Sequence, residues 1–395
     1  MSMASNRPCA RTVAVARAIV VTMALCLLVR TVAAQDESEA EKPAQPASMV
    51  RSAWLWRTTM EQGWDSNVRF TSGADDPDYV SRVNSSVALL RAGLRGSMGV
   101  IVDGSLVRYN QIEGFNTVNY DLILTGKRRI TPLTTGTAGV FHRKLLATGV
   151  VGAVQLPLLA LANQTSTGAD MMVEHRLTPK ISGVLDAAYT FVAFDTPALL
   201  SGGAVQVRVR GRRQYTSRDA VLLEGVVQQG RSNGLPLSAQ TVEAGWEPQL
   251  GRVGLRLLGG MTRVSTGGPS STVPTGLAEV RDSIGHGLFS AGTTRSVAQA
   301  FGVGQLLTTT AGSVAYDFQA RRGNFLTLGA SIADSRESTG AGIRFQSSLF
   351  SASLRRVLSN GATFGCGVAY REREDVTTAS GLGAQMQLGY TFGSR

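Results

Sequence analysis

The stretch from residue 381 to residue 392, Gly-Leu-Gly-Ala-Gln-Met-Gln-Leu-Gly-Tyr-Thr-Phe, alternates apolar with polar or small residues. A period of two is typical of a β-strand with one apolar and one polar face. The polar face carries Gln385 and Gln387, and the apolar face carries Leu382, Ala384, Met386, Leu388, Tyr390 and Phe392. The stretch closes the chain, ends in aromatic residues and follows many segments of like length. Together these features indicate a closed β-barrel in an outer membrane.

The first 34 residues have the pattern of a secretory signal peptide. Arginines precede the apolar run 18–29, and Val32-Ala33-Ala34 supplies the small residues that a signal peptidase requires. The run is too short for a membrane-spanning helix, which needs about 20 residues. We therefore expect cleavage after Ala34. Residues 35–52 are acidic and rich in Pro and Ala, which predicts a disordered periplasmic lead-in.

The mature chain reads as strands and turns, so the predicted fold class is all-β, a transmembrane antiparallel up-and-down barrel over residues 53–392 with a C-terminal extension at 393–395. Most predicted strands reach the roughly 9 to 11 residues that a tilted spanning strand needs. About 18 strands are expected, and loss of a hairpin between 265 and 308 would leave 16. Their expected bounds are 53–62, 80–92, 98–110, 117–127, 133–145, 165–176, 181–194, 202–211, 218–229, 238–248, 251–264, 273–281, 286–295, 309–320, 324–334, 341–355, 361–371 and 380–392.

The expected connections alternate between short turns and longer polar loops. Pro, Gly and Asn concentrate in the short turns, as at Glu247-Pro-Gln-Leu-Gly251, because these residues suit turn conformations. Outer-membrane barrels place short turns in the periplasm and long loops outside. If the last strand runs inward, every short turn is periplasmic. The partly apolar loops that begin at Ala147 and Ser296 are candidates to plug the pore.

Several arginines alternate with aliphatic residues, as in Val205-Gln-Val-Arg-Val-Arg210. A charged Arg on the lipid face costs about 2–4 kcal/mol at mid-membrane, so such residues should face the lumen or lie at a rim. Arg also binds carboxylate and phosphate through two hydrogen bonds. The candidate lumen anion path is Arg208, Arg210, Arg252, Arg256, Arg344 and Arg371. The alternative is that these arginines line the rims, pair with lumen acids such as Asp121, Glu224 and Asp317, or contact the phosphate groups of lipopolysaccharide.

Aromatic residues near the predicted strand ends fit the two girdles at membrane interfaces. The expected girdle consists of Trp54, Trp56, Tyr120, Tyr189, Trp246, Tyr370, Tyr390 and Phe392.

Catalytic patterns are weak. Gly230-Arg-Ser-Asn-Gly234 matches G-x-S-x-G, but that motif requires a sharp turn between a buried strand and a helix, and here it falls in a polar hairpin. His142, His175 and His286 are scattered and lack metal-ligand spacing. We expect no enzyme, no metal and no cofactor. The arginines are spread over the strands of a secreted chain and form no compact patch, which argues against nucleic-acid binding.

The chain resembles the family of type 2 β-barrel porins, many of whose members accompany exopolysaccharide production. The resemblance rests on Trp64-Asp-Ser-Asn-Val68, on the segment from Arg176-Leu-Thr-Pro179 to Tyr189, and on the segment from Arg356-Val-Leu-Ser359 to Tyr370. It implies an outer-membrane barrel at the cell surface with a role in polysaccharide export.

The sequence leads us to expect one of two functions. The first is a channel in the Gram-negative cell envelope that exports polysaccharide or passes anionic solutes along lumen arginines. The second is a structural or surface-interaction barrel whose loops close the pore. The expected partners are outer-membrane lipid and lipopolysaccharide, the barrel assembly machinery and, for export, the exopolysaccharide export components.

Overall fold

A computed structural model describes residues 51–68, 77–112, 114, 116–147, 162–197, 199–232, 234–321, 323–338, 342, 344–358, 360–374 and 378–394. The expected signal peptide and the lead-in as far as residue 50 lie outside the described residues. Within the described ranges, no helix is long and apolar enough to cross a membrane.

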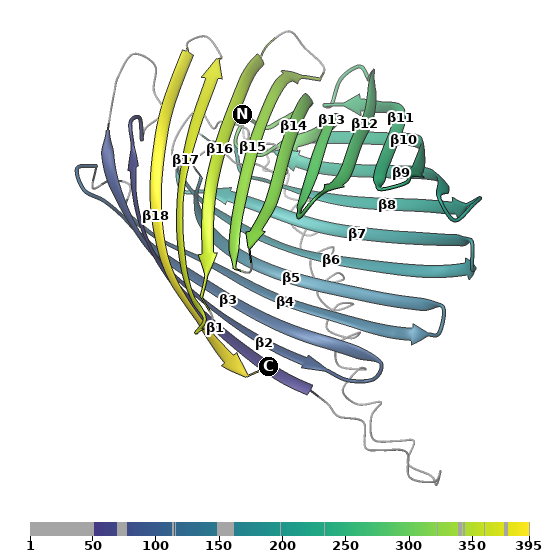
Figure 1. The fold of residues 1–395 in the computed structure, drawn as a ribbon. Helices are drawn as coiled ribbons and strands as arrows, with labels where there is room; N and C mark the ends of the chain where they lie inside the picture. The colour runs from purple at the N-terminus through teal and green to yellow at the C-terminus, as the bar shows by residue number, and fades with distance from the viewer. Residues whose placement is uncertain are drawn as a thin grey trace, which may run out of the picture.

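The described chain forms eighteen strands, the larger of the two numbers expected from the sequence (Figure 1). Most strands are longer than their pattern predicted. They are β1 (Arg51–Asp65), β2 (Asp78–Ala92), β3 (Gly96–Tyr109), β4 (Thr117–Thr131), β5 (Thr134–Ala147), β6 (Ala162–Thr178), β7 (Ile181–Phe194), β8 (Gly202–Gln214), β9 (Asp219–Ser232), β10 (Leu235–Leu250), β11 (Val253–Ser265), β12 (Ser271–Ile284), β13 (Gly287–Ala300), β14 (Gln305–Arg321), β15 (Asn324–Glu337), β16 (Arg344–Val357), β17 (Ala362–Glu374) and β18 (Thr378–Ser394).

Every strand pairs antiparallel with the next in sequence, and β1 pairs with both β2 and β18. This last pairing closes the sheet into an up-and-down barrel, so that every strand has a paired neighbour on both sides. Figure 1 shows β18 beside β1 at this seam. Two expected boundaries are corrected. Because β1 begins at Arg51 and Trp54 pairs with Ser394, residues 51 and 52 belong to the barrel and the supposed extension continues β18.

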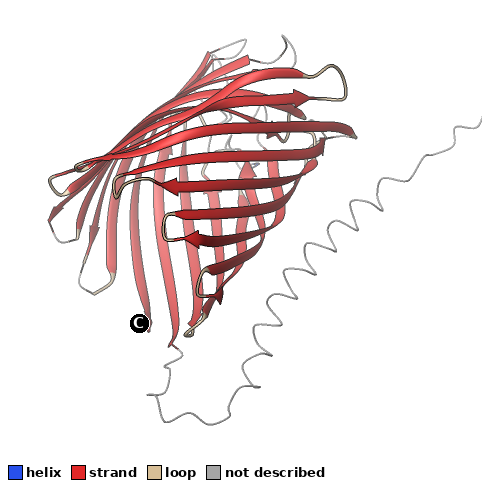
Figure 2. Cartoon of the chain, turned by 90° about the vertical axis from the view of Figure 1, so that its right-hand side faces the viewer, coloured by secondary structure: helices blue, strands red, loops and turns tan. Residues whose placement is uncertain are grey.

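Short turns gather at the end of the barrel where β1 begins and β18 ends, which we call the terminus end. The opposite end, where most of the longer connections lie, is the loop end. Figure 2 shows turns joining neighbouring strands along the wall. Gly251 and Gly285 lie in two-residue turns at the terminus end, with φ of 66° and 60°. Such φ values strain residues with a Cβ, which explains the glycines at these turns.

Side chains alternate between an outward apolar face and an inward polar face. On β8, Val205, Val207 and Val209 are 38%, 38% and 56% exposed. Arg208 and Arg210, at the alternate positions, form ion pairs inside the barrel. The same alternation holds on β18, where Met386 and Leu388 are exposed and Gln387 lines an inner hollow. The period-two pattern of the sequence therefore assigned these faces correctly.

Aromatic rings cross the seam on the outward face. Phe392 of β18 lies 4.6 Å from the ring of Trp56 and 5.7 Å from the ring of Trp54. Aromatic pairs in such geometries contribute about 0.5–1.5 kcal/mol each beyond their buried area. The final aromatic residue therefore stabilises closure of the barrel as well as facing outward.

We expect Phe392→Ala to lower the free energy of unfolding by roughly 1–3 kcal/mol, because it removes the ring contacts with both tryptophans across the seam. Urea titration of the barrel folded into phospholipid vesicles measures this difference. Phe364→Ala is the matched control, since Phe364 faces outward on β17 and is 38% exposed. Equal losses in the two variants would show that the seam contacts add nothing beyond apolar area.

Candidate functional site

One inner wall of the barrel carries arginines held by glutamates. Glu224 of β9 lies between two arginines of β8: Arg208 Nε is 3.3 Å from its Oε1, and Arg210 Nε is 2.7 Å from its Oε2. The Glu224 side chain is only 9% exposed. Strands β8 and β9 bring these residues together because Arg210 and Glu224 are direct cross-strand partners. A buried carboxylate thus fixes two guanidinium groups on the lumen surface.

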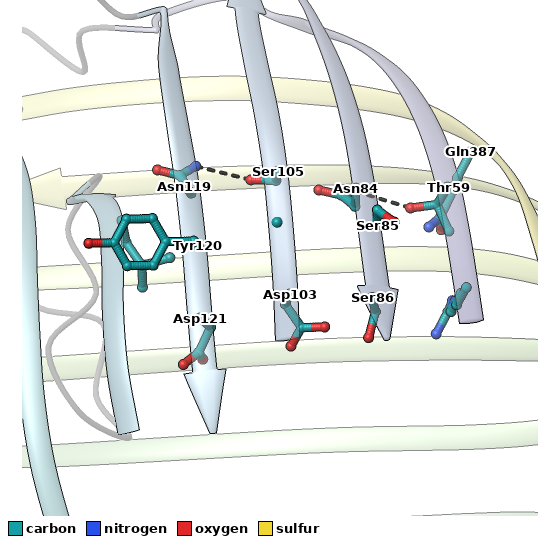
Figure 3. A pocket seen from close by; sticks show the side chains of 13 residues that line it. Thr59, Asn84, Ser85, Ser86, Asp103, Ser105, Asn119, Tyr120, Asp121 and Gln387 are labelled. Carbon is teal, nitrogen blue, oxygen red and sulfur yellow. Dashed lines mark hydrogen bonds between the residues drawn. The ribbon is translucent and has the colours of Figure 1, made fainter. Parts of the chain in front are cut away.

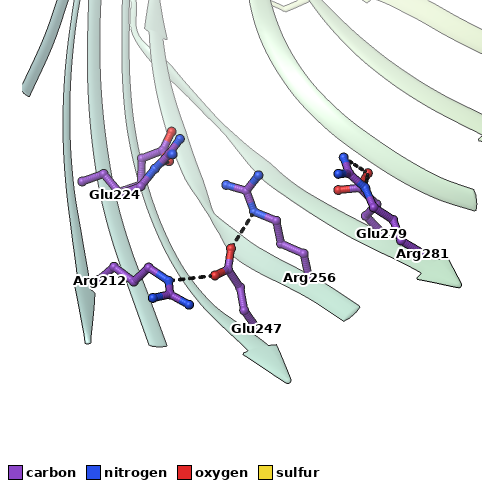
Figure 4. Close-up of polar contacts among 7 residues, drawn as sticks. Arg212, Glu224, Glu247, Arg256, Glu279 and Arg281 are labelled. Atoms are coloured by element: carbon purple, nitrogen blue, oxygen red, sulfur yellow. Dashed lines mark hydrogen bonds and ion pairs between the residues drawn. The ribbon is translucent and has the colours of Figure 1, made fainter. Parts of the chain in front are cut away.

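The same wall continues across β10, β11 and β12. Glu247 of β10 accepts a hydrogen bond from Arg212 Nε at 3.1 Å and forms an ion pair with Arg256 Nε at 3.3 Å (Figure 4). On β12, Arg281 Nη2 lies 2.6 Å from Glu279 Oε1. We call the five arginines and their three carboxylates the arginine–glutamate wall: Arg208, Arg210, Arg212, Arg256, Arg281, Glu224, Glu247 and Glu279. A fourth carboxylate, Glu243, faces inward on the same wall, opposite Glu224 in register.

The arginines of β8 and β11 contact their glutamates through Nε. Within the described residues, their Nη groups donate no hydrogen bond to a protein group. Each guanidinium therefore keeps two nitrogen atoms with which it can donate hydrogen bonds to water or to a solute. The carboxylates hold the side chains in place, so that little rotamer entropy remains to be lost when an anion binds.

The other predicted path residues lie elsewhere. Arg371 of β17 faces inward, with Nη2 at 2.6 Å from Asp65 Oδ2 and 3.0 Å from the carbonyl oxygen of Asn67. Arg252 is exposed in the turn between β10 and β11, so it lies at the rim of the terminus end.

The lumen placement of Arg344 was wrong. Its register on β16 puts it on the face of Phe350 and Leu354, which are outward and about half exposed. A period-two pattern cannot separate a lumen arginine from an outward arginine at a strand end, because charge on the lipid face costs only about 0–1 kcal/mol near the interfaces. Arg344 is such a case, since it begins β16 at the loop end.

A polar hollow of about 480 Å³ lies on the inner side of β1 to β5. Asn84 Nδ2 donates to Thr59 Oγ1 at 3.1 Å, and Asn119 Nδ2 donates to Ser105 Oγ at 3.2 Å (Figure 3). Asp103 and Asp121 lie side by side as direct cross-strand partners on β3 and β4. The lumen is therefore not uniformly cationic, because this wall adds carboxylates.

The sequence had identified three lumen acids, and the structure places all three on inward faces. Asp121 lies 3.7 Å from Arg143 Nε, Glu224 joins the arginine–glutamate wall, and Asp317 accepts a hydrogen bond from Thr327 Oγ1 at 2.7 Å. Sequence reasoning missed Asp103, Glu247 and Glu279. All three occupy the alternate positions that form the polar face of their strands, so the pattern that identified the arginines could have identified them too.

The end of the β13–β14 hairpin is folded into the lumen. β12 pairs with β13 only as far as Gly276 and Arg295, although β13 continues to Ala300. Beyond that point β13 and β14 pair with each other up to Ala300 and Gln305. We call residues 297–307 the inturned hairpin end. The loop expected to begin at Ser296 is therefore mostly strand.

Both faces of the inturned hairpin end are buried against inward-facing wall residues. Leu306, 1% exposed, packs with Leu237, Ala239 and Val264 of β10 and β11. Leu307, also 1% exposed, packs with Phe345 of β16. A hairpin that touches β10, β11 and β16 from inside narrows the lumen at the loop end.

Contacts with other connections hold the tip of this hairpin. Gly302 and Leu200, in the connection between β7 and β8, exchange two backbone hydrogen bonds of 2.9 Å. Phe301 packs on Val192 and Ala204 of β7 and β8. The second candidate plug, which begins at Ala147, lies almost wholly outside the described residues.

All eight predicted girdle residues have outward parity in the strand registers. Those at the terminus end are Trp54, Trp56, Trp246, Tyr390 and Phe392, and those nearer the loop end are Tyr120, Tyr189 and Tyr370. Their role as membrane anchors stays a prediction.

The G-x-S-x-G match and the histidines do not come together in the described chain. Gly230 to Ser232 belong to β9, with Ser232 only 1% exposed. His142 faces outward and contacts Tyr120 and Thr167, and His175 contacts Thr134. Among the described residues, no group of three or more His, Cys, Asp or Glu side chains could hold a metal ion.

The fold thus defines a class, a wide closed antiparallel barrel of eighteen strands with a polar interior. Solved structures of Pseudomonas aeruginosa proteins share this fold. OpdK with vanillate has a TM-score of 0.51 and 12% identity, and the match covers 86% of this chain and 99% of that chain. OpdO has a TM-score of 0.51 and 14% identity, over 87% of this chain and 98% of that chain. OpdQ is similar as well, with a TM-score of 0.51 and 12% identity, over 88% of this chain and 100% of that chain. At such identities the similarity shows the fold alone. No family model and no curated protein matches the chain, so the resemblance to type 2 porins stays a prediction.

Proposed function

We propose that the protein is an outer-membrane channel for small anionic solutes, which pass along the arginine–glutamate wall. The observation that carries this proposal is the pair of fixed guanidinium groups on either side of the buried Glu224. Preorganised donors along a lumen lower the barrier for an anion without binding it so tightly that it cannot leave. Together with Glu243, the wall has five guanidinium groups against four carboxylates, which leaves a small positive excess.

The barrel itself supports an outer-membrane location. Its outward face carries exposed apolar side chains on most strands, and such a surface is stable in lipid but costly in water. The similar fold of OpdK belongs to a protein described as an outer membrane protein of Pseudomonas aeruginosa. With a cleaved signal peptide and both termini in the periplasm, the terminus end is periplasmic and the loop end faces outside.

A carboxylate-bearing solute is the class that the wall suits best. A guanidinium fork matches the two oxygen atoms of a carboxylate. OpdK has been crystallised with vanillate, an aromatic carboxylate, which supports this class by analogy of fold alone. Polysaccharide export, which the type 2 porin resemblance implies, fits less well, since the inturned hairpin end occupies part of the path that a polymer would need.

The same hairpin favours a second candidate, a structural barrel that conducts little. Its two faces are fully packed at Leu306 and Leu307. Planar-bilayer recording separates the two functions. We expect discrete conductance steps and an anion-selective reversal potential in a KCl gradient. Purified protein that gives no steps would support the closed barrel, and a cation-selective reversal potential would contradict the arginine path.

A further inference from the structure

Two arginines face each other on the outside of the barrel at the loop end. Arg336 of β15 and Arg344 of β16 are direct cross-strand partners, and their side chains are 58% and 55% exposed. They have the parity of Ile332 and Phe350, which are 61% and 49% exposed on the apolar outer face. Both guanidinium groups therefore lie just beyond the apolar surface.

A single carboxylate holds this pair. Asp334 Oδ2 lies 2.6 Å from Arg336 Nη2, and its Oδ1 lies 3.2 Å from Arg344 Nε. Like charges on directly opposed residues destabilise a sheet, and one carboxylate offsets only one of the two positive charges. These three residues therefore carry a net charge of +1 and keep unused guanidinium N–H groups on the outward face.

More basic residues surround the barrel at the same level. By register they face outward near the loop end of their strands, and the structure shows each arginine among them as exposed. They are Arg108, Lys144, Arg231, Arg263 and Arg295. We call these five, together with Arg336 and Arg344, the outer basic belt. Apolar outward residues such as Leu106 and Met261 follow on the membrane side of the belt.

We propose that Arg336 and Arg344 form a binding site for the phosphate groups of lipopolysaccharide, with the rest of the outer basic belt supplying weaker contacts. Phosphate suits the site because arginine binds phosphate oxygens through paired hydrogen bonds. The acyl chains of the same molecule would cover the apolar face next to the belt. The site rests on the outer-membrane placement in the proposed function, because the loop end must contact the outer leaflet.

The test uses the folded full barrel in a neutral detergent, with diphosphoryl lipid A as the probe. Native mass spectrometry counts the lipid molecules retained as the lipid concentration rises. We expect Arg336→Gln with Arg344→Gln to weaken binding about tenfold, since two charge-assisted contacts are lost. Asp334→Asn keeps both arginines and removes the competing carboxylate, so it should strengthen binding.

Matched controls decide whether the effect belongs to this site. Arg91→Gln with Arg356→Gln removes two exposed outward arginines at the terminus end and should leave binding unchanged. Equal weakening by this control would overturn the proposal and indicate general charge attraction. Equal binding of dephosphorylated lipid A would overturn it as well. Full competition by millimolar inorganic phosphate would assign the site to free phosphate instead.

The outcomes for the lipid site and for the channel are separable. A barrel that conducts anions in a neutral bilayer, but binds lipid A equally well with and without Arg336 and Arg344, would overturn the lipid site alone. A barrel that binds lipid A at these residues and gives no conductance steps would overturn the channel alone.

Discussion

Substituting glutamine for Arg208, Arg210, Arg212 and Arg256 is expected to reverse the selectivity of the channel from anions to cations. The four substitutions remove four positive charges and leave Glu224, Glu243 and Glu247 on the wall. At 4 Å a pair of unit charges interacts by about 1 kcal/mol even in bulk water, which corresponds to a roughly fivefold change in local ion concentration. The reversal potential in a KCl gradient measures the change directly.

The buried position of Glu224 calls for a second variant. Removing both of its arginines leaves a nearly buried carboxylate unpaired, which costs about 3–5 kcal/mol and could prevent folding. Adding Glu224→Gln to Arg208→Gln and Arg210→Gln removes that cost, because no charge is left unpaired. This triple variant should fold and lose anion selectivity without becoming strongly cation selective.

Arg252 provides the matched control for the wall. It was predicted from the sequence as a path residue, but it lies exposed in the turn at the terminus end. Arg252→Gln should shift the reversal potential much less than any pair of substitutions on the wall. A reversal potential that is unchanged in the fourfold variant would show that the wall does not face the conducting path.

The fold was largely predictable because a barrel repeats one simple pattern. The alternation in residues 381–392 assigned the outward and inward faces of β18, and the same alternation placed Arg208 and Arg210 on the lumen side. Strand ends were predicted too short, as at β13, because pairing continues through residues such as Gln299 and Ala300 that show no alternation signal. The end of a strand depends on its partner, which a single segment does not reveal.

The site was less predictable than the fold, for two physical reasons. A single strand shows that Arg210 faces inward, but only the register between strands shows that Glu224 lies directly opposite it. The inturned hairpin end is harder still. Leu306 and Leu307 are adjacent and point to opposite faces of β14, yet both are buried. The rule that every second residue of a strand faces the lipid therefore fails where a hairpin leaves the barrel wall.

Removing the inturned hairpin end is expected to raise single-channel conductance at least about twofold, because a barrel of this size leaves an aqueous channel unless it is plugged. Ser296 and Thr309 are direct partners on β13 and β14. Joining them through Asn-Gly in place of residues 297–308 should make a two-residue hairpin turn without disturbing the wall below. Planar-bilayer recording of this variant and of the native barrel gives the comparison.

A milder change should loosen the hairpin rather than remove it. Leu306→Ala with Leu307→Ala creates cavities on both faces, at a cost of about 2–5 kcal/mol per side chain. The hairpin should then leave its packed position for part of the time, and single channels should flicker between a low and a high conductance level. Leu328→Ala is the control, since Leu328 faces outward on β15 at 41% exposure. If the shortened hairpin and the double alanine variant both conduct like the native barrel, residues 297–307 do not limit the path, and the narrowest point must lie elsewhere along the lumen.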